Sequence, residues 1–100
     1  MVVEILYFEG CPHYAEARDS VERVSGELGL SPEIRLVRVA DIAAAERLRF
    51  LGSPTVRVNG HDVEPGADER GDFAFSCRVY AAGAGVPDER LLRDALAASG

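Results

Sequence analysis

Residues 2–8 form a nearly continuous run of apolar and β-branched side chains that leads into a Gly-Cys-Pro turn and then a helical pattern. Such a run suits a strand that is covered on both faces, which places it inside a sheet rather than at an edge. A strand that hands over directly to a helix is typical of α/β architecture. We therefore predict an α/β fold with residues 2–8 at the centre of its sheet.

The helical pattern runs from Pro12 to about Leu28, where apolar positions step by three and four and charged side chains face away. Pro12 fits the first turn of this helix, because its missing N–H needs no partner there. Gly29 then serves as the helix stop.

The later elements follow from the same kinds of pattern. In chain order we predict a strand over residues 33–39, a helix over 41–48, strands over 55–58 and 61–64, and a helix over 87–98. Asp41 caps the second helix and Gly52 ends it. Asn59-Gly60 predicts a two-residue hairpin, because both residues tolerate positive φ. The predicted order is βαβαββα, with a four-stranded mixed sheet and helices on both of its faces.

Residues 65–86 are an inserted segment that is longer than a compact domain leaves without structure. Within it Phe73, Phe75, Cys77 and Val79 alternate with smaller or polar residues. This period of two predicts an extended piece laid on the core. The chain of 100 residues, 47% of them hydrophobic, suffices for one core and is too short for two. We therefore predict that residues 1–100 form a single domain.

Charge and apolar patterning exclude several classes of protein. Eleven basic against seventeen acidic side chains give a formal charge of -6, the wrong sign for a surface that neutralises nucleic-acid phosphates. The first residues lack the pattern of a signal peptide, and no apolar run approaches the ~20 residues that span a bilayer. We expect a soluble, cytoplasmic protein without nucleic-acid or membrane partners. Two cysteines are too few for a disulfide scaffold.

Cys11 has the strongest case for chemistry. It follows the buried strand and precedes the helix, so its sulfur is expected near unpaired backbone N–H groups and the positive end of the helix dipole, which stabilise a thiolate. A protonated His13 would add to this effect. The alternatives are that Cys11 is a small buried hydrophobe and that His13 is a solvated polar residue. The exposed junction between strand and helix favours a reactive thiol.

Two motifs, together with the order of the elements, resemble the thioredoxin superfamily. Cys11-Pro12-His13 is similar to the start of the Cys-Pro-His-Cys motif of the bacterial disulfide-oxidant branch. Gly52-Ser53-Pro54-Thr55-Val56 is similar to the cis-proline turn that precedes the third core strand of that superfamily. The resemblance covers about residues 2–64 and 87–98. It implies a thioredoxin-like fold.

The resemblance also implies a set of site residues. The Ser53–Pro54 bond is expected to be cis, and the backbone of Ser53 is expected to offer itself to an extended substrate. The implied substrate-binding residues are Pro12, Tyr14, Ser53 and Pro54. The other reading of Pro54 is a trans proline that starts an edge strand.

This sequence departs from the superfamily pattern at Tyr14, which stands where the second cysteine of the motif would be. A dithiol cycle within one helical turn is therefore excluded. Our first hypothesis is a thiol–disulfide oxidoreductase, or a thiol-dependent reductase, in which Cys11 attacks sulfur and is aided by His13. Cys77, or an external thiol such as glutathione, resolves the mixed disulfide. The substrate would be an oxidised protein or small molecule, with no cofactor and no resident metal.

Two other functions stay open. Cys11 and Cys77 would suit a soft ion such as Hg(II) or Cu(I), because two thiolates favour low-coordinate soft metals. Some similar short chains are labelled as related to alkylmercury lyase, but that chemistry uses several cysteines and an acid. The loss of the second motif cysteine would also suit a non-catalytic interaction module. The acidic residues from Asp62 to Asp72, and His61 beside them, are interpreted as solvated.

Overall fold

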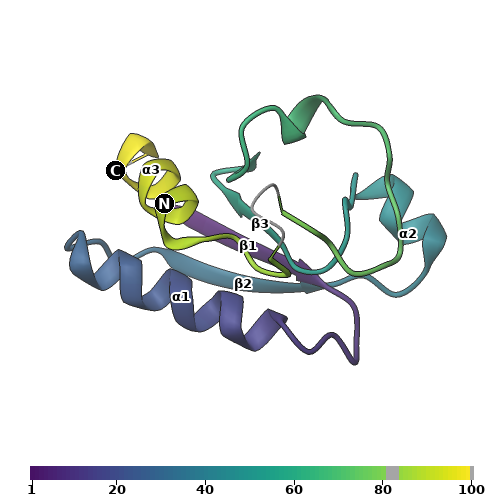
Figure 1. The fold of residues 1–100 in the computed structure, drawn as a ribbon, viewed down its shortest axis with the longest axis horizontal. Helices are drawn as coiled ribbons and strands as arrows, with labels where there is room; N and C mark the ends of the chain where they lie inside the picture. The colour runs from purple at the N-terminus through teal and green to yellow at the C-terminus, as the bar shows by residue number, and fades with distance from the viewer. Residues whose placement is uncertain (81–83, 100) are drawn as a thin grey trace.

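The computed structural model describes residues 1–80 and 84–99, which form a four-stranded mixed sheet with helices packed against it (Figure 1). The strands are β1 (Val2–Tyr7), β2 (Glu33–Arg38), β3 (Thr55–Val58) and β4 (His61–Asp62), in the order β2-β1-β3-β4. β1 runs parallel to β2 and antiparallel to β3. The interior position of the first strand and the mixed character of the sheet are therefore confirmed.

The connections explain these directions. The parallel pair β1 and β2 is joined through the helix α1 (Tyr14–Glu27), because parallel neighbours need a long crossover. β3 and β4 are joined by Asn59 and Gly60, whose φ angles of 49° and 86° are those of the predicted tight turn. β4 is shorter than predicted, since its pairing with β3 stops at Asp62.

Helices cover both faces of the sheet. Val3 and Ile5 of β1 share one core cluster with α1 and with α3 (Glu89–Ser99). Leu6 points to the opposite face, where it packs with Phe50 and with α2 (Ile42–Arg47). Successive residues of a strand alternate between faces, so the apolar run of β1 supplies both clusters. In Figure 1 the helices α1 and α3 lie apart from α2.

The ends of two helices differ from the predictions. α1 begins at Tyr14 with His13 as its N-cap, so Pro12 lies in the preceding turn and not in the helix. α2 has the predicted Asp41 cap, whose carboxylate accepts the Ala44 N–H at 2.8 Å. This helix ends at Arg47, well before Gly52, and the reversal of the chain is made by Arg49 at φ 56°.

The inserted segment is partly ordered, as predicted, and the face that it buries is not the apolar one. A short 3-10 helix, η1 (Ala67–Glu69), is followed by an extended stretch at residues 74–80, which we call the strap. Arg78 and Tyr80 of the strap are buried, whereas Phe75, Cys77 and Val79 are exposed. The alternation exists, but the pairing of the strap with the rest of the fold selects the other set of residues.

No helix in the described ranges 1–80 and 84–99 is long and apolar enough to cross a membrane.

The packing of α3 gives a first prediction. Leu92 of α3 is fully buried in the cluster beneath β1, whereas Leu36 of β2 is 40% exposed. Replacing Leu92 with alanine removes buried methyl groups and leaves a cavity, so we expect a loss of about 2–5 kcal/mol in the free energy of unfolding. The Leu36→Ala control is expected to lose less than about 1 kcal/mol. Urea unfolding followed by circular dichroism measures both. Equal losses would contradict the assignment of α3 to the core.

Candidate functional site

Cys11 lies in the turn between β1 and α1, where its N–H donates to the Phe8 carbonyl at 3.2 Å. The residue is only 5% exposed, so the expectation of an exposed junction is wrong for Cys11 itself. The neighbouring Gly10, at φ 91°, and Pro12 are exposed, and the turn folds the Cys11 side chain inward between them. Cys11 is thus a covered thiol in this conformation.

The two residues after Pro12 make contacts of their own. His13 Nδ1 lies 3.6 Å from the Glu16 carboxylate, and its ring packs against Gly85, where an added Cβ would meet ring atoms at 2.8 Å. Tyr14 stacks on Tyr7 of β1 with ring centroids 4.4 Å apart. Tyr14, in the position of the missing cysteine, therefore fastens the start of α1 to the sheet. Among the described residues, no hydrogen bond or ion pair joins His13 to Cys11.

The Ser53–Pro54 bond is cis, as the resemblance implied. Ser53 is fully buried, and its backbone already has partners: its N–H donates to the Ser76 carbonyl at 2.8 Å, and its carbonyl accepts the Arg78 N–H at 3.0 Å. These two bonds make a parallel bridge between Ser53 and Cys77. The strap thus occupies the backbone groups that the resemblance assigned to an extended substrate.

Both cysteines lie at the same end of the sheet. The Ser53 hydroxyl accepts the Phe8 N–H at 3.4 Å, and the Phe8 carbonyl accepts the Cys11 N–H. A hydrogen-bonded path therefore runs from Cys11 through Phe8 and Ser53 to the strap. The rings of Phe8 and Phe75 add a contact at 5.3 Å between the same two segments. Both thiols are free: Cys11 is buried and Cys77 is exposed.

A buried ion-pair network holds the strap in place. The Arg78 side chain, 1% exposed, donates to both oxygens of the Asp62 carboxylate at 2.7 and 2.9 Å. It also reaches the Glu64 carboxylate at 3.3 Å and the Thr55 hydroxyl at 3.2 Å. Its guanidinium lies 4.2 Å from the centre of the Tyr80 ring. This arrangement surrounds the buried charge with several partners, as low-dielectric surroundings require, although the Arg78 Nε has none among the described residues.

Tyr80 closes the network onto the cis-proline turn. Its hydroxyl donates to the Pro54 carbonyl at 2.6 Å. Burial raises the pKa of Tyr80 far above its usual value, so the hydroxyl keeps its proton and stays a donor. The pKa of Arg78 is raised as well: burial acts against the charged form, but the bonds from Asp62 outweigh it. Arg78 therefore remains a cation in the interior.

Sequence reasoning missed Arg78 and Tyr80, and it misjudged Asp62 and Glu64. The acidic stretch was interpreted as solvated, whereas the Asp62 side chain is 2% exposed and that of Glu64 is 13% exposed. The signal was present in the alternation itself, because Arg78 and Tyr80 occupy the positions between the apolar residues. An arginine at an inward position indicates a buried acidic partner. Asp62 and Glu64, which follow the Asn59-Gly60 turn, are acidic residues of this kind. His61, 82% exposed, is solvated as predicted.

No family model matches the chain, and no curated protein and no solved structure does either. Within the described residues there is no group of three or more histidine, cysteine or acidic side chains that would hold a metal ion.

The network predicts a strong effect of Arg78→Ala. This change leaves the Asp62 carboxylate buried without its cation, while Glu64 keeps its contact with Arg70. Removal of one partner from a buried pair costs about 3–5 kcal/mol. The control is Arg93→Ala, because Arg93 forms a half-exposed ion pair with Glu27 at 2.7 Å and such pairs are worth less than about 1 kcal/mol. Chemical denaturation measures both. A loss for Arg78→Ala no larger than that of the control would refute the role of Arg78.

The close approach of the strap to Gly52 gives a further prediction. A Cβ at Gly52 would lie 2.9 Å from the Arg78 Cα, and its φ of 115° is unfavourable for other residues. We expect Gly52→Ala to push the strap away, so that the amide of Arg78 exchanges its hydrogen faster. Gly71→Ala is the control, since a Cβ there meets nothing within 4 Å. Hydrogen exchange by NMR decides; unchanged protection at Arg78 in Gly52→Ala would count against this close approach.

Proposed function

We propose that this chain is a thioredoxin-like thiol–disulfide oxidoreductase with Cys11 as its nucleophile and Cys77 as its resolving thiol. The observation that carries the proposal is the hydrogen-bonded path that links the backbone of Cys11, through Phe8 and Ser53, to the strap that bears Cys77. The thioredoxin-like fold is part of the proposal. It is supported by the strand order β2-β1-β3-β4 and by the turn at Ser53 and Pro54.

The start of α1 favours Cys11 over Cys77 as the attacking thiol. The N-cap His13 makes no side-chain capping bond to the helix, so the first N–H groups of α1 are not satisfied by a capping side chain. Free N–H groups and the helix dipole both favour negative charge at this end of a helix. Cys11, in the turn that enters this helix, is the nearer of the two thiols along the chain.

The reaction balances with these two thiols. The Cys11 thiolate attacks one sulfur of an oxidised substrate, forms a mixed disulfide with it and releases the other sulfur as a thiolate that takes up a proton. The Cys77 thiolate then attacks the Cys11 sulfur, releases the second substrate thiolate and leaves a disulfide between Cys11 and Cys77. Two molecules of an external thiol such as glutathione return the two electrons and become one disulfide.

The burial of Cys11 sets a condition on this cycle. A sulfur that is covered by the fold meets an external disulfide only after the turn or the strap moves. Release of the strap would also free the N–H and carbonyl of Ser53, which now bond to Ser76 and Arg78. An extended substrate could then pair with Ser53 in place of the strap.

The test compares Cys11→Ser with Cys77→Ser in the reduction of a small disulfide by glutathione. We expect Cys11→Ser to abolish turnover, because the attacking thiol is missing and Cys77 acts only in the second step. In a separate incubation with the disulfide and without glutathione, we expect Cys77→Ser to hold a mixed disulfide on Cys11, because no resolving thiol is present. Intact-protein mass spectrometry detects it. His13→Ala reports separately on whether the imidazole aids the reaction.

Two results would overturn the assignment. One is full turnover by Cys11→Ser. The other is a mixed disulfide that forms on Cys77 in Cys11→Ser as fast as it forms on Cys11 in Cys77→Ser.

A further inference from the structure

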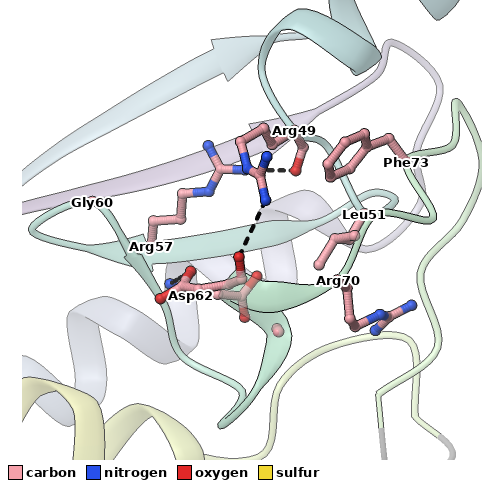
Figure 2. A pocket seen from close by; sticks show the side chains of 9 residues that line it. Arg49, Leu51, Arg57, Gly60, Asp62, Arg70 and Phe73 are labelled. Atoms are coloured by element: carbon pink, nitrogen blue, oxygen red, sulfur yellow. Dashed lines mark hydrogen bonds between the residues drawn. The ribbon is translucent and has the colours of Figure 1, made fainter.

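A pocket beside the β3–β4 hairpin lies outside the cysteine site (Figure 2). Its open volume is about 100 Å³, several times the roughly 10–15 Å³ that one water requires. Arg49, Arg57 and Arg70 line it together with Leu51 and Phe73. The pocket thus combines cationic groups with apolar walls.

Two of these arginines are held by neutral groups. Arg57 Nη2 donates to the carbonyls of Leu48 and Arg49, at 2.8 Å each. Arg49 Nη2 donates to the Asp68 carbonyl at 3.2 Å, and its guanidinium lies 4.9 Å from the centre of the Phe73 ring. Among the described residues, neither guanidinium has a carboxylate at ion-pair distance, and their other N–H groups have no protein acceptor. Most other arginines of this acidic chain do pair with carboxylates.

The acidic residues nearby are already engaged. Asp62 is bonded to Arg78, and Arg70 is bonded to Asp72 at 2.6 and 2.9 Å. Asp68 accepts the Asp62 N–H at 2.9 Å and lies 3.2 Å from His61. Burial favours the neutral form of Asp68, but these partners outweigh it and lower its pKa, so it is ionised. One carboxylate therefore faces two unpaired guanidinium groups, and positive charge is in excess.

The backbone conformation of Arg49 also supports a role for its side chain in the pocket. Arg49 adopts φ 56° directly after the end of α2, a place where glycine is favoured because it has no Cβ. Arginine at a left-handed position costs conformational energy. Its side chain contacts the Asp68 carbonyl and the Phe73 ring. The side chain is directed to the pocket at a cost to the turn.

We propose that this pocket binds a phosphate group, either as the free ion or carried by a small molecule with an apolar part. Guanidinium groups present flat arrays of N–H donors that match the oxygens of phosphate. Two guanidinium groups against the Asp68 carboxylate leave one positive charge in excess, and a bound phosphate group would balance it. Leu51 and Phe73 would contact the organic part of an ester. This site does not rest on the thiol chemistry proposed above.

The test is a titration of the full chain with inorganic phosphate and with phenyl phosphate, at constant ionic strength, followed by the NMR signals of the arginine side chains. We expect saturable shifts at Arg49 and Arg57 with both ligands. Tighter binding of phenyl phosphate would identify an ester as the ligand, and equal binding would identify the free ion; both support a phosphate site.

The decisive variant is Arg49→Gly. It removes the guanidinium but relieves the left-handed turn, so the protein keeps its thermal midpoint within a few degrees while affinity falls about tenfold, the loss of one charged hydrogen bond. Arg47→Ala is the control, because Arg47 is an exposed residue of α2 that does not line the pocket. Wild-type affinity in Arg49→Gly, or an equal loss in Arg47→Ala, would overturn the proposal, since binding would then follow overall charge.

Discussion

The ion pairing of the buried Arg78 guanidinium is the interaction on which the second half of the fold depends. A charge that is taken out of water needs partners of opposite charge and good geometry. Asp62 and Glu64 supply that charge from the end of the hairpin, and Tyr80 supplies a ring face beside it. Because these partners come from β4, from the residue after Val63 and from the strap itself, binding one buried cation also fixes where the inserted segment crosses the turn that precedes β3.

This crossing determines what is accessible at the cis-proline turn. The strap takes both backbone groups of Ser53, buries Arg78 and Tyr80 and turns Cys77 to the solvent. Gly52 permits the approach, since no side chain would fit between the turn and Arg78. The site is therefore closed by a part of the same chain. In the proposed function, a thiol reaction at Cys11 is linked through the hydrogen bonds of Ser53 to the strap that Arg78 holds.

The hairpin joins the two proposed sites physically. The Asp62 carboxylate holds Arg78 on the strap side, while its N–H donates to Asp68, which lines the arginine pocket. The pocket and the strap thus share one short strand. Each has a different chemistry, a thiol pair on one side and unpaired guanidinium groups on the other, and each can be tested without the other.

The sequence by itself determined the elements whose causes are local. The apolar run of β1, the Asp41 cap and the Asn59-Gly60 turn each act over a few residues, and they predicted the α/β sheet with its central strand. The same local reasoning brought Cys11 to the end of β1, whereas the pairing of β1 with β3 is what brings Ser53 beside it. It did not reveal that Cys11 is covered or that helix α1 starts after Pro12.

Only the tertiary structure decided which face of the strap is buried. An extended segment of alternating residues has two possible inward faces, and hydrophobicity favoured the apolar one with Phe75, Cys77 and Val79. The face with Arg78 is buried because the guanidinium of Arg78 pairs with Asp62 and Glu64, which are distant along the chain. A local hydrophobic pattern contains no information about the energy with which distant residues pair. The pocket lined by Arg49 and Arg57 also depends on contacts between distant parts of the chain.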